Sequence, residues 1–581
     1  MEYAQRLLGL LDAWPVRVVL GLTLFYVCLR IALLPPHRPK QTREVANLPG
    51  PPSPPYVGWL IGNMADIAEF RDTVMHPDWI KMGWTGRCQH IFGQETIWTY
   101  DPVAMGSILQ QADVWQRADN TERLLGRITG SGLLTAKGAD HRRQRRIVNP
   151  AFSTNAIKAM IPTMFDKADL CANILGQCVD DDSLEHFAAR YPPKPEDRVP
   201  GARKVDLLAL MSKLTQDVIG AAGFNTDLES LRPKENALDS SIQYMLNTLF
   251  DDTIILMGQN LFWSLDKTCS GRWTRLCVDS RLADPTQPLR NRRAMKACRG
   301  VMEKLSARLM RDRAAQIATE PEDADEDKVP DMLDLLVKAN MAEREDQRLS
   351  DEEVRSQLLT LLFAGSTTTA GTICSLLRFM AKHPDIQMRL REEIESTEER
   401  PNFETLNALP LLDAVVRETL RLEPPASCTV RTNVQDTVIP LSVPVRGRDG
   451  TMIEKALPVG KGSYVFLSIS SLQQHPDVWG PDAADFNPDR YKDPTIPKMN
   501  IPGMWGGLAA FISGPHHCIG FRLALAEIKV ATFTLLRHFS FDELPSKPDI
   551  FIVMNVASRP EVKGESGGQM PLLVRRIETT T

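Results

Sequence analysis

The sequence predicts a mainly helical fold with small β-sheets, built as one large domain. Apolar residues recur at helical spacing through most of the chain, and only short runs alternate in the way that strands require. No repeat of about 20 to 50 residues is visible, and the polar, proline-containing breaks at 192–201 and 320–328 are too short to separate domains. With 581 residues, of which 43% are hydrophobic and 24% charged, the chain can bury one large core.

The N-terminal segment 1–44 is expected to anchor the protein in a membrane. Residues 18–34 are apolar apart from Arg30, and a stretch of this length is at the lower end of the roughly 17 to 25 residues that span a bilayer. Four basic residues follow between positions 37 and 43, so the positive-inside rule puts the downstream chain in the cytosol. A cleaved signal peptide is the alternative, but the small-residue cleavage pattern is missing.

A proline-rich segment follows the expected span. Residues 48–55 read LPGPPSPP, and proline fixes the backbone and interrupts helices. We therefore expect 45–55 to form a stiff, extended hinge and 56–581 to form the catalytic domain.

Charge and cysteine content exclude several classes of protein. The net charge of -5 offers no basic excess for a phosphate backbone, so nucleic acid is not expected as a partner. Ten cysteines occur without a Cys-x-x-Cys pair, which argues against a zinc ribbon or a thioredoxin-type motif. Most of them are expected to be buried or free thiols in a reducing compartment.

Two helices are expected to carry chemically important residues. The first starts at a capping box, Ser350 followed by Glu353, and runs to Lys382 before a proline. Its middle reads AGSTTT at 364–369, which opposes helix propensity, so a local distortion there would need a compensating reason. The second helix ends before Pro424 and places Glu418 and Arg421 on one face.

A cysteine stands in a glycine-bearing loop directly before a third expected helix, 521–538. The loop, 511–520, reads FISGPHHCIG, and backbone N–H groups with the helix dipole can stabilise the thiolate of Cys518 there. Such a thiolate can hold iron. Alternatives are an ordinary buried cysteine, or a zinc site with His516 and His517, although no second ligand cluster is evident.

Four separated motifs in one order together resemble the cytochrome P450 family. The proline-rich hinge after the expected anchor is similar to that of microsomal members, and the overall pattern resembles fungal-type members. The motifs are AGSTT at 364–368, similar to the oxygen-binding helix; Glu418-x-x-Arg421; FNPDRY at 486–491; and the loop of Cys518. The resemblance extends from about residue 45 to the C-terminus. It implies the cytochrome P450 fold, with haem b between the oxygen-binding helix and the helix after the cysteine loop.

The resemblance also implies how the haem is held. Cys518 would be the axial ligand of the iron, as the family's thiolate is, and the loop glycines would let backbone amides approach its sulfur. Arg145 resembles the arginine of the family's W-x-x-x-R, and Arg431 a second contact to the propionates. Two departures are expected to weaken these contacts or make them pH-sensitive, because His141 replaces the tryptophan and His516 replaces an arginine.

For proton delivery the resemblance points to Thr368, whose position matches the family's threonine. The residue before it is usually an acid but is Thr367 here, which puts the usual proton path in doubt. Thr367, Thr369 and ordered water are candidates to share the role. The alternative for Thr367 and Thr369 is a structural role, in which each hydroxyl donates a hydrogen bond to a carbonyl of its own helix.

Glu418, Arg421 and Arg490 are expected to form a buried scaffold network of one carboxylate between two guanidiniums. Removing one partner strands a buried charge, so their loss should prevent haem incorporation.

Substrate contacts are implied by the resemblance at 115–134, 244–262, near Phe363 and Ala364, and at 426–430. These segments hold many apolar residues and few charges, which predicts an apolar pocket. The alternative for each residue is core packing.

The expected function is a monooxygenase that oxidises an apolar small molecule with O2 and electrons from NADPH. These electrons would come from a separate NADPH–cytochrome P450 reductase, with cytochrome b5 as a second candidate donor. The reaction would take place at the cytosolic face of the endoplasmic reticulum membrane. Fungal specialised metabolism is the expected context, and fatty-acid or xenobiotic hydroxylation is the alternative. A peroxide-using or isomerising haem-thiolate enzyme, or a non-catalytic haem protein, are rival classes.

Overall fold

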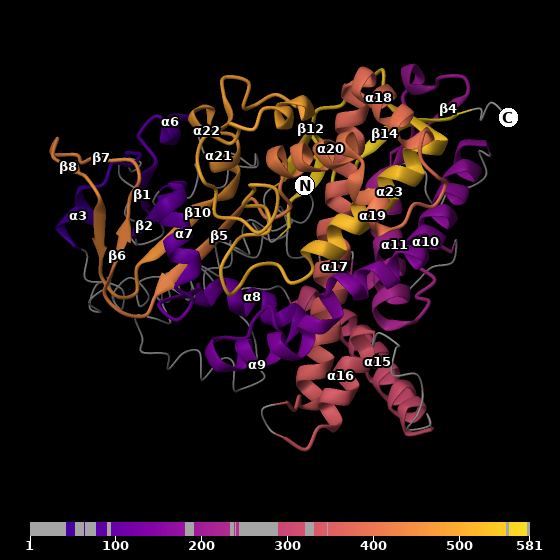
Figure 1. The fold of residues 1–581 in the computed structure, drawn as a ribbon, viewed down its shortest axis with the longest axis horizontal. Helices are drawn as coiled ribbons and strands as arrows, with labels where there is room; N and C mark the ends of the chain where they lie inside the picture. Colours follow the sequence, from indigo (N-terminus) through magenta and orange to yellow (C-terminus); the bar gives the residue numbers. More distant parts are fainter. Residues whose placement is uncertain are drawn as a thin grey trace, which may run out of the picture.

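Helices dominate the fold, and the largest β-sheet lies to one side of them (Figure 1). The computed structural model describes residues 42–52, 63, 77–89, 95–180, 191–232, 238, 240–242, 244, 289–319, 331–344, 347–553 and 557–577. The predicted membrane span at 18–34 and the last part of the expected hinge lie outside these residues. The mainly helical class predicted from periodicity is confirmed.

The central helix is α17 (Asp351–Lys382), which has the bounds that the sequence predicts. The Ser350 hydroxyl accepts a hydrogen bond from the Glu353 amide (3.2 Å), and the Glu353 carboxylate accepts one from the Ser350 amide (2.9 Å). These bonds satisfy two amides that a helix start leaves unpaired. At the other end, α18 (Pro384–Glu395) begins at a proline that cannot continue α17. No distortion interrupts the helix at its threonines.

Helix α17 is a core helix. Within the described part of the chain it is the helix whose length and composition could span a membrane, but 78% of its most apolar window is buried inside the protein. It packs against α11 (Leu207–Val218), α23 (Phe521–His538) and α20 (Pro410–Leu422). Helix α10 (Thr154–Asp180) covers α23 and α11 from outside, as Figure 1 shows.

The remaining helices surround this core. They are α3 (Arg43–Asn47), α6 (Pro77–Ile80), α7 (Pro102–Gln110), α8 (Asp119–Thr129), α9 (Gly138–Val148), α15 (Leu289–Thr319), α16 (Met332–Met341), α19 (Phe403–Ala408), α21 (Ile469–Gln473) and α22 (Pro476–Trp479), with short helical turns at η2 (Asn149–Phe152), η4 (Pro195–Asp197), η5 (Ile219–Gly223) and η6 (Pro488–Lys492).

The largest sheet has the strand order β1-β2-β10-β5-β3. Strand β10 pairs in parallel with β2 and antiparallel with β5, and β5 pairs antiparallel with β3. This last register places Arg117 of β3 directly opposite Arg431 of β5, and cross-strand partners lie close enough to interact. The strands are β1 (Thr85–Gln89), β2 (Glu95–Thr99), β3 (Trp115–Arg117), β5 (Cys428–Asn433) and β10 (Tyr464–Ser468).

The other strands form small sheets that support the helices. A three-stranded sheet has the order β11-β14-β4, and β6 with β9, β7 with β8 and β12 with β13 form pairs. Their bounds are β4 (Ala202–Asp206), β6 (Thr437–Pro440), β7 (Val445–Arg446), β8 (Met452–Ile453), β9 (Ala456–Val459), β11 (Phe539–Asp542), β12 (Ile550–Val553), β13 (Arg559–Val562) and β14 (Pro571–Arg576).

The packed body begins by Thr42, earlier than the residue 56 expected from the proline run. The Thr42 hydroxyl donates to the Pro458 carbonyl (2.7 Å), and Leu48 is fully buried. Although proline lacks an N–H group, its carbonyl still accepts, and the Pro49 carbonyl takes a hydrogen bond from the Arg87 amide of β1 (2.8 Å). The N-terminal part of the expected hinge is therefore attached to the large sheet.

Deleting residues 1–55 should destabilise the protein, whereas deleting residues 1–41 should leave the packed contacts of the body intact. The single change Leu48→Ala should cost about 2 to 5 kcal/mol, because it opens a cavity at a fully buried position. Chemical denaturation of the two truncated proteins and the point variant measures this. The matched control is Val438→Ala at an exposed apolar position, and equal stability of both truncated proteins would contradict the assignment.

Candidate active site

The loop of Cys518 is fixed by close packing on its glycine. The Cys518 amide donates to the Phe511 carbonyl (3.0 Å). Gly514 has a positive φ of 75°, and a Cβ atom there would lie 2.1 Å from the Leu109 carbonyl oxygen at the end of α7. Only glycine combines this backbone conformation with so close an approach. Gly514 therefore seats the loop on α7, a role different from the expected approach of its amide to the sulfur.

The sulfur of Cys518 faces an internal cavity just before the start of α23. The residue has accessible surface, and this surface belongs to the cavity lining. Burial raises the pKa of the thiol, while the Gly520 amide and the positive charge of Arg145 lower it. The last two groups are thus placed to stabilise a thiolate, as the sequence predicts for a loop before a helix.

The cavity is bounded by α17, α23, α9 and the loop of Cys518. Of the residues singled out from the sequence, Cys518, His516, His141, Arg145 and Thr368 line it, with Thr369. Thr367 and Arg431 are not among the lining residues. The apolar part of the wall comes from Leu133, Leu134, Phe152, Ile219, Leu361 and Leu523.

Basic side chains gather at one wall of the cavity. The rings of His141 and His516 are in contact, with centroids 3.9 Å apart. Burial, followed by repulsion from neighbouring cations, lowers the pKa of His141 to about 4 and of His516 to about 3. Burial, followed by repulsion from Arg117, lowers the pKa of Arg431 to about 9. The cluster therefore destabilises its own charges and suits an anionic partner.

Arg117 is a member of this wall that sequence reasoning missed. It lines the cavity and donates to the Leu134 carbonyl (2.8 Å), and burial lowers its pKa. The sequence analysis included it only within the segment 115–134 expected to contact substrate. Its place in the basic cluster follows from strand pairing with Arg431, more than three hundred residues away.

The same wall fits a haem group. The buried Nδ1 atom of His516 has no hydrogen-bond partner among the described residues, although buried polar atoms are normally paired. Two propionate carboxylates next to His516, His141 and the arginines would supply both the missing partner and the missing negative charge. Cys518 presents its sulfur to the same cavity. By contrast, no cluster of three or more His, Cys, Asp or Glu able to hold a metal ion by itself occurs in the described ranges, so the zinc alternative finds no support there.

Arg145 is tied to the cysteine loop. One of its guanidinium nitrogens donates to the His517 carbonyl (2.8 Å), and another lies 2.8 Å from His517 Nε2. His517 Nδ1 in turn lies 2.9 Å from the Gly514 carbonyl. His517 thus orients Arg145, a role that the sequence did not suggest.

Helix α9, which carries His141 and Arg145, is held against α17 by amide side chains. Gln357 Nε2 donates to Gln144 Oε1 (2.7 Å), and Gln144 Nε2 donates to the Glu353 carboxylate (3.1 Å). Both glutamines are almost fully buried. The distance between the cation wall and α17 is therefore set by direct hydrogen bonds.

The structure brings Glu418, Arg421 and Arg490 together in one buried network. Arg421 donates to both carboxylate oxygens of Glu418 (2.7 and 2.8 Å), and Arg490 Nε donates to Oε1 (2.8 Å). Their side chains are 0 to 2% exposed. Sequence reasoning missed two members, because the Tyr491 hydroxyl and the Asn487 amide also donate to Glu418 (3.2 and 2.9 Å).

The threonines of α17 bond back to their own helix. The Thr367 hydroxyl donates to the Phe363 carbonyl (3.0 Å) and the Thr368 hydroxyl to the Ala364 carbonyl (2.8 Å). This is the structural alternative considered for Thr367, and it also applies to Thr368. These bonds are compatible with an uninterrupted helix.

The segments expected to contact substrate reach the cavity unequally. Within 115–134, Arg117, Leu133 and Leu134 line it; Ala364 lines it and Phe363 does not; no residue of 426–430 does. Of 244–262, all but Tyr244 lies outside the described residues.

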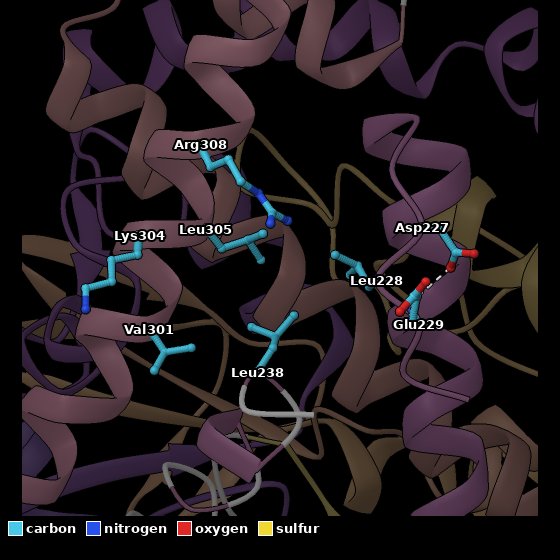
Figure 2. Close-up of a pocket in the computed structure, with 8 residues that line it drawn as sticks. All are labelled: Asp227, Leu228, Glu229, Leu238, Val301, Lys304, Leu305 and Arg308. Atoms are coloured by element: carbon cyan, nitrogen blue, oxygen red, sulfur yellow. Dashed lines mark hydrogen bonds between the residues drawn. The ribbon is translucent and has the colours of Figure 1, made fainter. Parts of the chain in front are cut away.

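A second pocket shares no lining residue with the cavity of Cys518. Figure 2 shows Asp227 and Glu229 on one side of it and Lys304 and Arg308 of α15 on the other. The Glu229 amide donates to the Asp227 carboxylate (3.1 Å). None of the site residues predicted from the sequence lies in this pocket.

Comparison with known proteins identifies the class. The family model of cytochrome P450 matches residues 51–564. Cytochrome P450 monooxygenase 205 of Postia placenta is 33% identical over 93% of this chain and 94% of its own length. Ganoderic acid synthetase of Ganoderma lucidum is 31% identical, over 91% of this chain and 93% of its own.

A solved structure agrees at the level of the fold. The crystal structure of a cytochrome P450, CYP102L1, superposes with a TM-score of 0.62 at 20% identity, covering 86% of this chain and 96% of the other. The chain belongs to the cytochrome P450 family, as a monooxygenase, and the family implies a haem-thiolate cofactor.

The variant Glu418→Gln should lose about 3 to 5 kcal/mol of stability and most of its haem. The change leaves the buried guanidinium of Arg421 without a counter-charge, whereas Arg490 keeps its ion pair with Asp482. Chemical denaturation and the haem-to-protein ratio after purification measure the two effects. Glu404→Gln, at a surface glutamate paired with Lys158, is the control. If both variants retained haem equally, the buried network would not be needed for incorporation.

Proposed function

We propose that this monooxygenase inserts one oxygen atom into an apolar small molecule of fungal specialised metabolism, with NADPH-derived electrons supplied by a separate reductase. The observation that supports this proposal most strongly is a single cavity lined by Cys518, by basic side chains, by Thr368 and by apolar side chains. The printed names of two fungal relatives, a ganoderic acid synthetase and the monooxygenase claW of Ampulloclitocybe clavipes (30% identical), support the metabolic context.

Each residue then has a defined task. Haem would supply the iron that activates dioxygen, and electron density from an axial thiolate favours O–O cleavage. Cys518 would hold the iron, and Arg145, Arg117, Arg431, His141 and His516 would hold the propionates. The leucine, isoleucine and phenylalanine side chains of the lining exclude water and favour an apolar substrate.

The Thr368 hydroxyl would hold the proton that the reaction requires. Its bond to the Ala364 carbonyl keeps its proton on the helix side, so the hydroxyl must turn toward the cavity to donate. Thr367 carries no carboxyl group and does not line the cavity. Thr367 is therefore a weaker candidate than Thr368 for proton transfer.

Electrons are proposed to come from NADPH–cytochrome P450 reductase, since monooxygenases of this family generally need such a partner. Cytochrome b5 is a second candidate donor. The apolar stretch 18–34 is proposed to anchor the protein in the endoplasmic reticulum membrane, with the body in the cytosol. Membrane fractionation of the full chain against a protein lacking residues 1–41 tests the anchor.

The decisive experiment measures NADPH and oxygen consumption by the holoenzyme with reductase present. Comparing extracted metabolites of a deletion strain and its parent supplies the substrate. The proposal expects NADPH-dependent oxygen insertion into that molecule. Product formed with neither NADPH nor oxygen would instead identify a peroxide-using or isomerising enzyme, a second candidate favoured by the missing acid at position 367.

The variant Thr368→Ala should mainly uncouple the reaction. Product per NADPH should fall about 10-fold or more and hydrogen peroxide should rise, because a positioned proton donor contributes roughly 10²- to 10⁴-fold. Thr367→Ala is the matched control, since its hydroxyl makes the same kind of bond to the helix but lies outside the cavity. Equal coupling in the two variants would contradict the role of Thr368.

A further inference from the structure

Two buried glutamines close a chain of hydrogen bonds that begins and ends on the loop 130–135. They are Gln144 of α9, which is 2% exposed, and Gln357 of α17, which is 0% exposed. The Leu133 amide donates to Gln357 Oε1 (3.1 Å), and Gln357 Nε2 donates to Gln144 Oε1 (2.7 Å). Gln144 Nε2 donates in turn to the Ser131 carbonyl (3.3 Å). The glutamine pair therefore joins this loop to both helices.

The hydrogen-bond partners fix the orientation of both side-chain amides. A backbone N–H group only donates, so the Gln357 atom that meets the Leu133 amide must be oxygen. A carbonyl and an ionised carboxylate only accept, so the Gln144 atom that meets Ser131 and Glu353 must be nitrogen. Each position therefore needs a donor and an acceptor on one side chain. A buried polar network that is satisfied in this way specifies a single arrangement of the segments that it joins.

The loop also lies directly on α17. A Cβ atom at Gly132 would lie 2.5 Å from Thr360 Oγ1 and 2.8 Å from the Ser356 carbonyl oxygen, so only glycine permits this approach. The Ser356 hydroxyl accepts a hydrogen bond from the Ser131 amide (3.1 Å). Backbone contact and the glutamine pair thus fix the same loop against the same helix.

The loop contributes an apolar part of the cavity wall. Leu133 and Leu134 line the cavity of Cys518, and α17 lines it with Ala364 and Thr368. Neither glutamine is among the lining residues. Any effect of the glutamine pair on a bound molecule must therefore pass through the two leucines.

We propose that Gln144 and Gln357 are positioning residues that hold Leu133 and Leu134 as a fixed apolar wall at a set distance from α17. A wall that is ordered before a ligand arrives loses little freedom when the ligand binds. The position of the reacting atoms is also sensitive to displacements of about 1 Å. The pair thereby controls how tightly a bulky apolar molecule binds and where the oxygen enters it. This inference rests on the proposed function and adds residues that govern its selectivity.

The first test measures azole binding to the ferric holoenzyme by absorbance, with imidazole as the small probe and 1-phenylimidazole as the bulky one. Gln144→Met and Gln357→Met remove the amides at nearly constant volume. The preference for 1-phenylimidazole over imidazole should fall about 5-fold or more, because the freed wall must be ordered again around the phenyl ring. The double variant should lose no more than either single variant, since both residues belong to one chain of hydrogen bonds.

Gln387→Met is the matched control. Gln387 is a buried glutamine of α18 that donates to the Met380 and Phe541 carbonyls (3.0 and 2.9 Å), and it does not line the cavity. Its replacement should lower the free energy of unfolding, as the replacement of Gln357 does, but leave the azole preference unchanged. A wild-type preference in Gln357→Met, or an equal loss in Gln387→Met, would overturn the proposal.

Gly132→Ala displaces the loop without altering either glutamine. The added Cβ atom must move away from the Ser356 carbonyl oxygen, which belongs to the backbone of α17. The azole preference should fall as it does in Gln357→Met. Gly300→Ala is the control, because a Cβ atom there meets nothing within 4 Å. A Gly132→Ala protein that binds haem and keeps the wild-type preference would also contradict the proposal.

The second test follows the products made from the molecule that the metabolite comparison identifies. Gln357→Met should distribute the oxygen over additional atoms of that molecule and lower kcat/KM about 10-fold or more, because the bound molecule is no longer held in one alignment. Gln387→Met should keep the wild-type product pattern. An unchanged pattern and kcat/KM in Gln357→Met would show that the glutamine pair does not position the substrate.

The two proposals fail in different ways. A wild-type enzyme that consumes no NADPH with reductase present contradicts the proposed function, and the azole titrations still decide the role of the glutamine pair. A wild-type enzyme that turns over, with Gln144→Met and Gln357→Met equal to it in both tests, overturns the positioning role and leaves the proposed function intact.

Discussion

The site depends on basic side chains that the protein buries, among the residues that the structure describes, without a matching cluster of carboxylates. Arg117 and Arg431 lie opposite each other on neighbouring strands, and His141 and His516 touch beside them, so that burial and mutual repulsion lower their pKa values. The contrasting case is Glu418, which accepts hydrogen bonds from two buried guanidiniums, one of which also pairs with Asp482. The basic cluster at the cavity is expected to be neutralised by an anionic cofactor. The Glu418 network, by contrast, stabilises the fold itself. Haem incorporation and stability should therefore be linked, since the cofactor would supply charge that the chain lacks.

Local sequence signals predicted the central elements well. The bounds of α17 and α23 follow from a capping box, a glycine-bearing loop and flanking prolines, all of which act within a few residues. The Glu418 network and most of the cavity lining followed from motif resemblance. Arg117 could not be found in this way, because it reaches the site through strand pairing between distant segments. The true start of the packed body was also missed, because proline carbonyls accept hydrogen bonds even though proline interrupts helices.

The two departures from the family pattern have different physical consequences. His516 stacks on His141 and leaves one ring nitrogen unpaired, so it can still donate to a carboxylate but offers less fixed charge than arginine. Thr367 removes an acid from the helix, and its hydroxyl bonds to Phe363 instead of facing the cavity.

The central claim is that Cys518 holds the haem iron as a thiolate at the base of this cavity. The reduced carbon monoxide spectrum of the purified, folded holoenzyme tests it most directly, with Cys518→Ser measured beside the wild type. The account predicts the red-shifted Soret band from which the family takes its name in the wild-type protein, and its loss in Cys518→Ser. A folded, haem-loaded wild type without that band, or a Cys518→Ser protein that keeps it, would contradict the account.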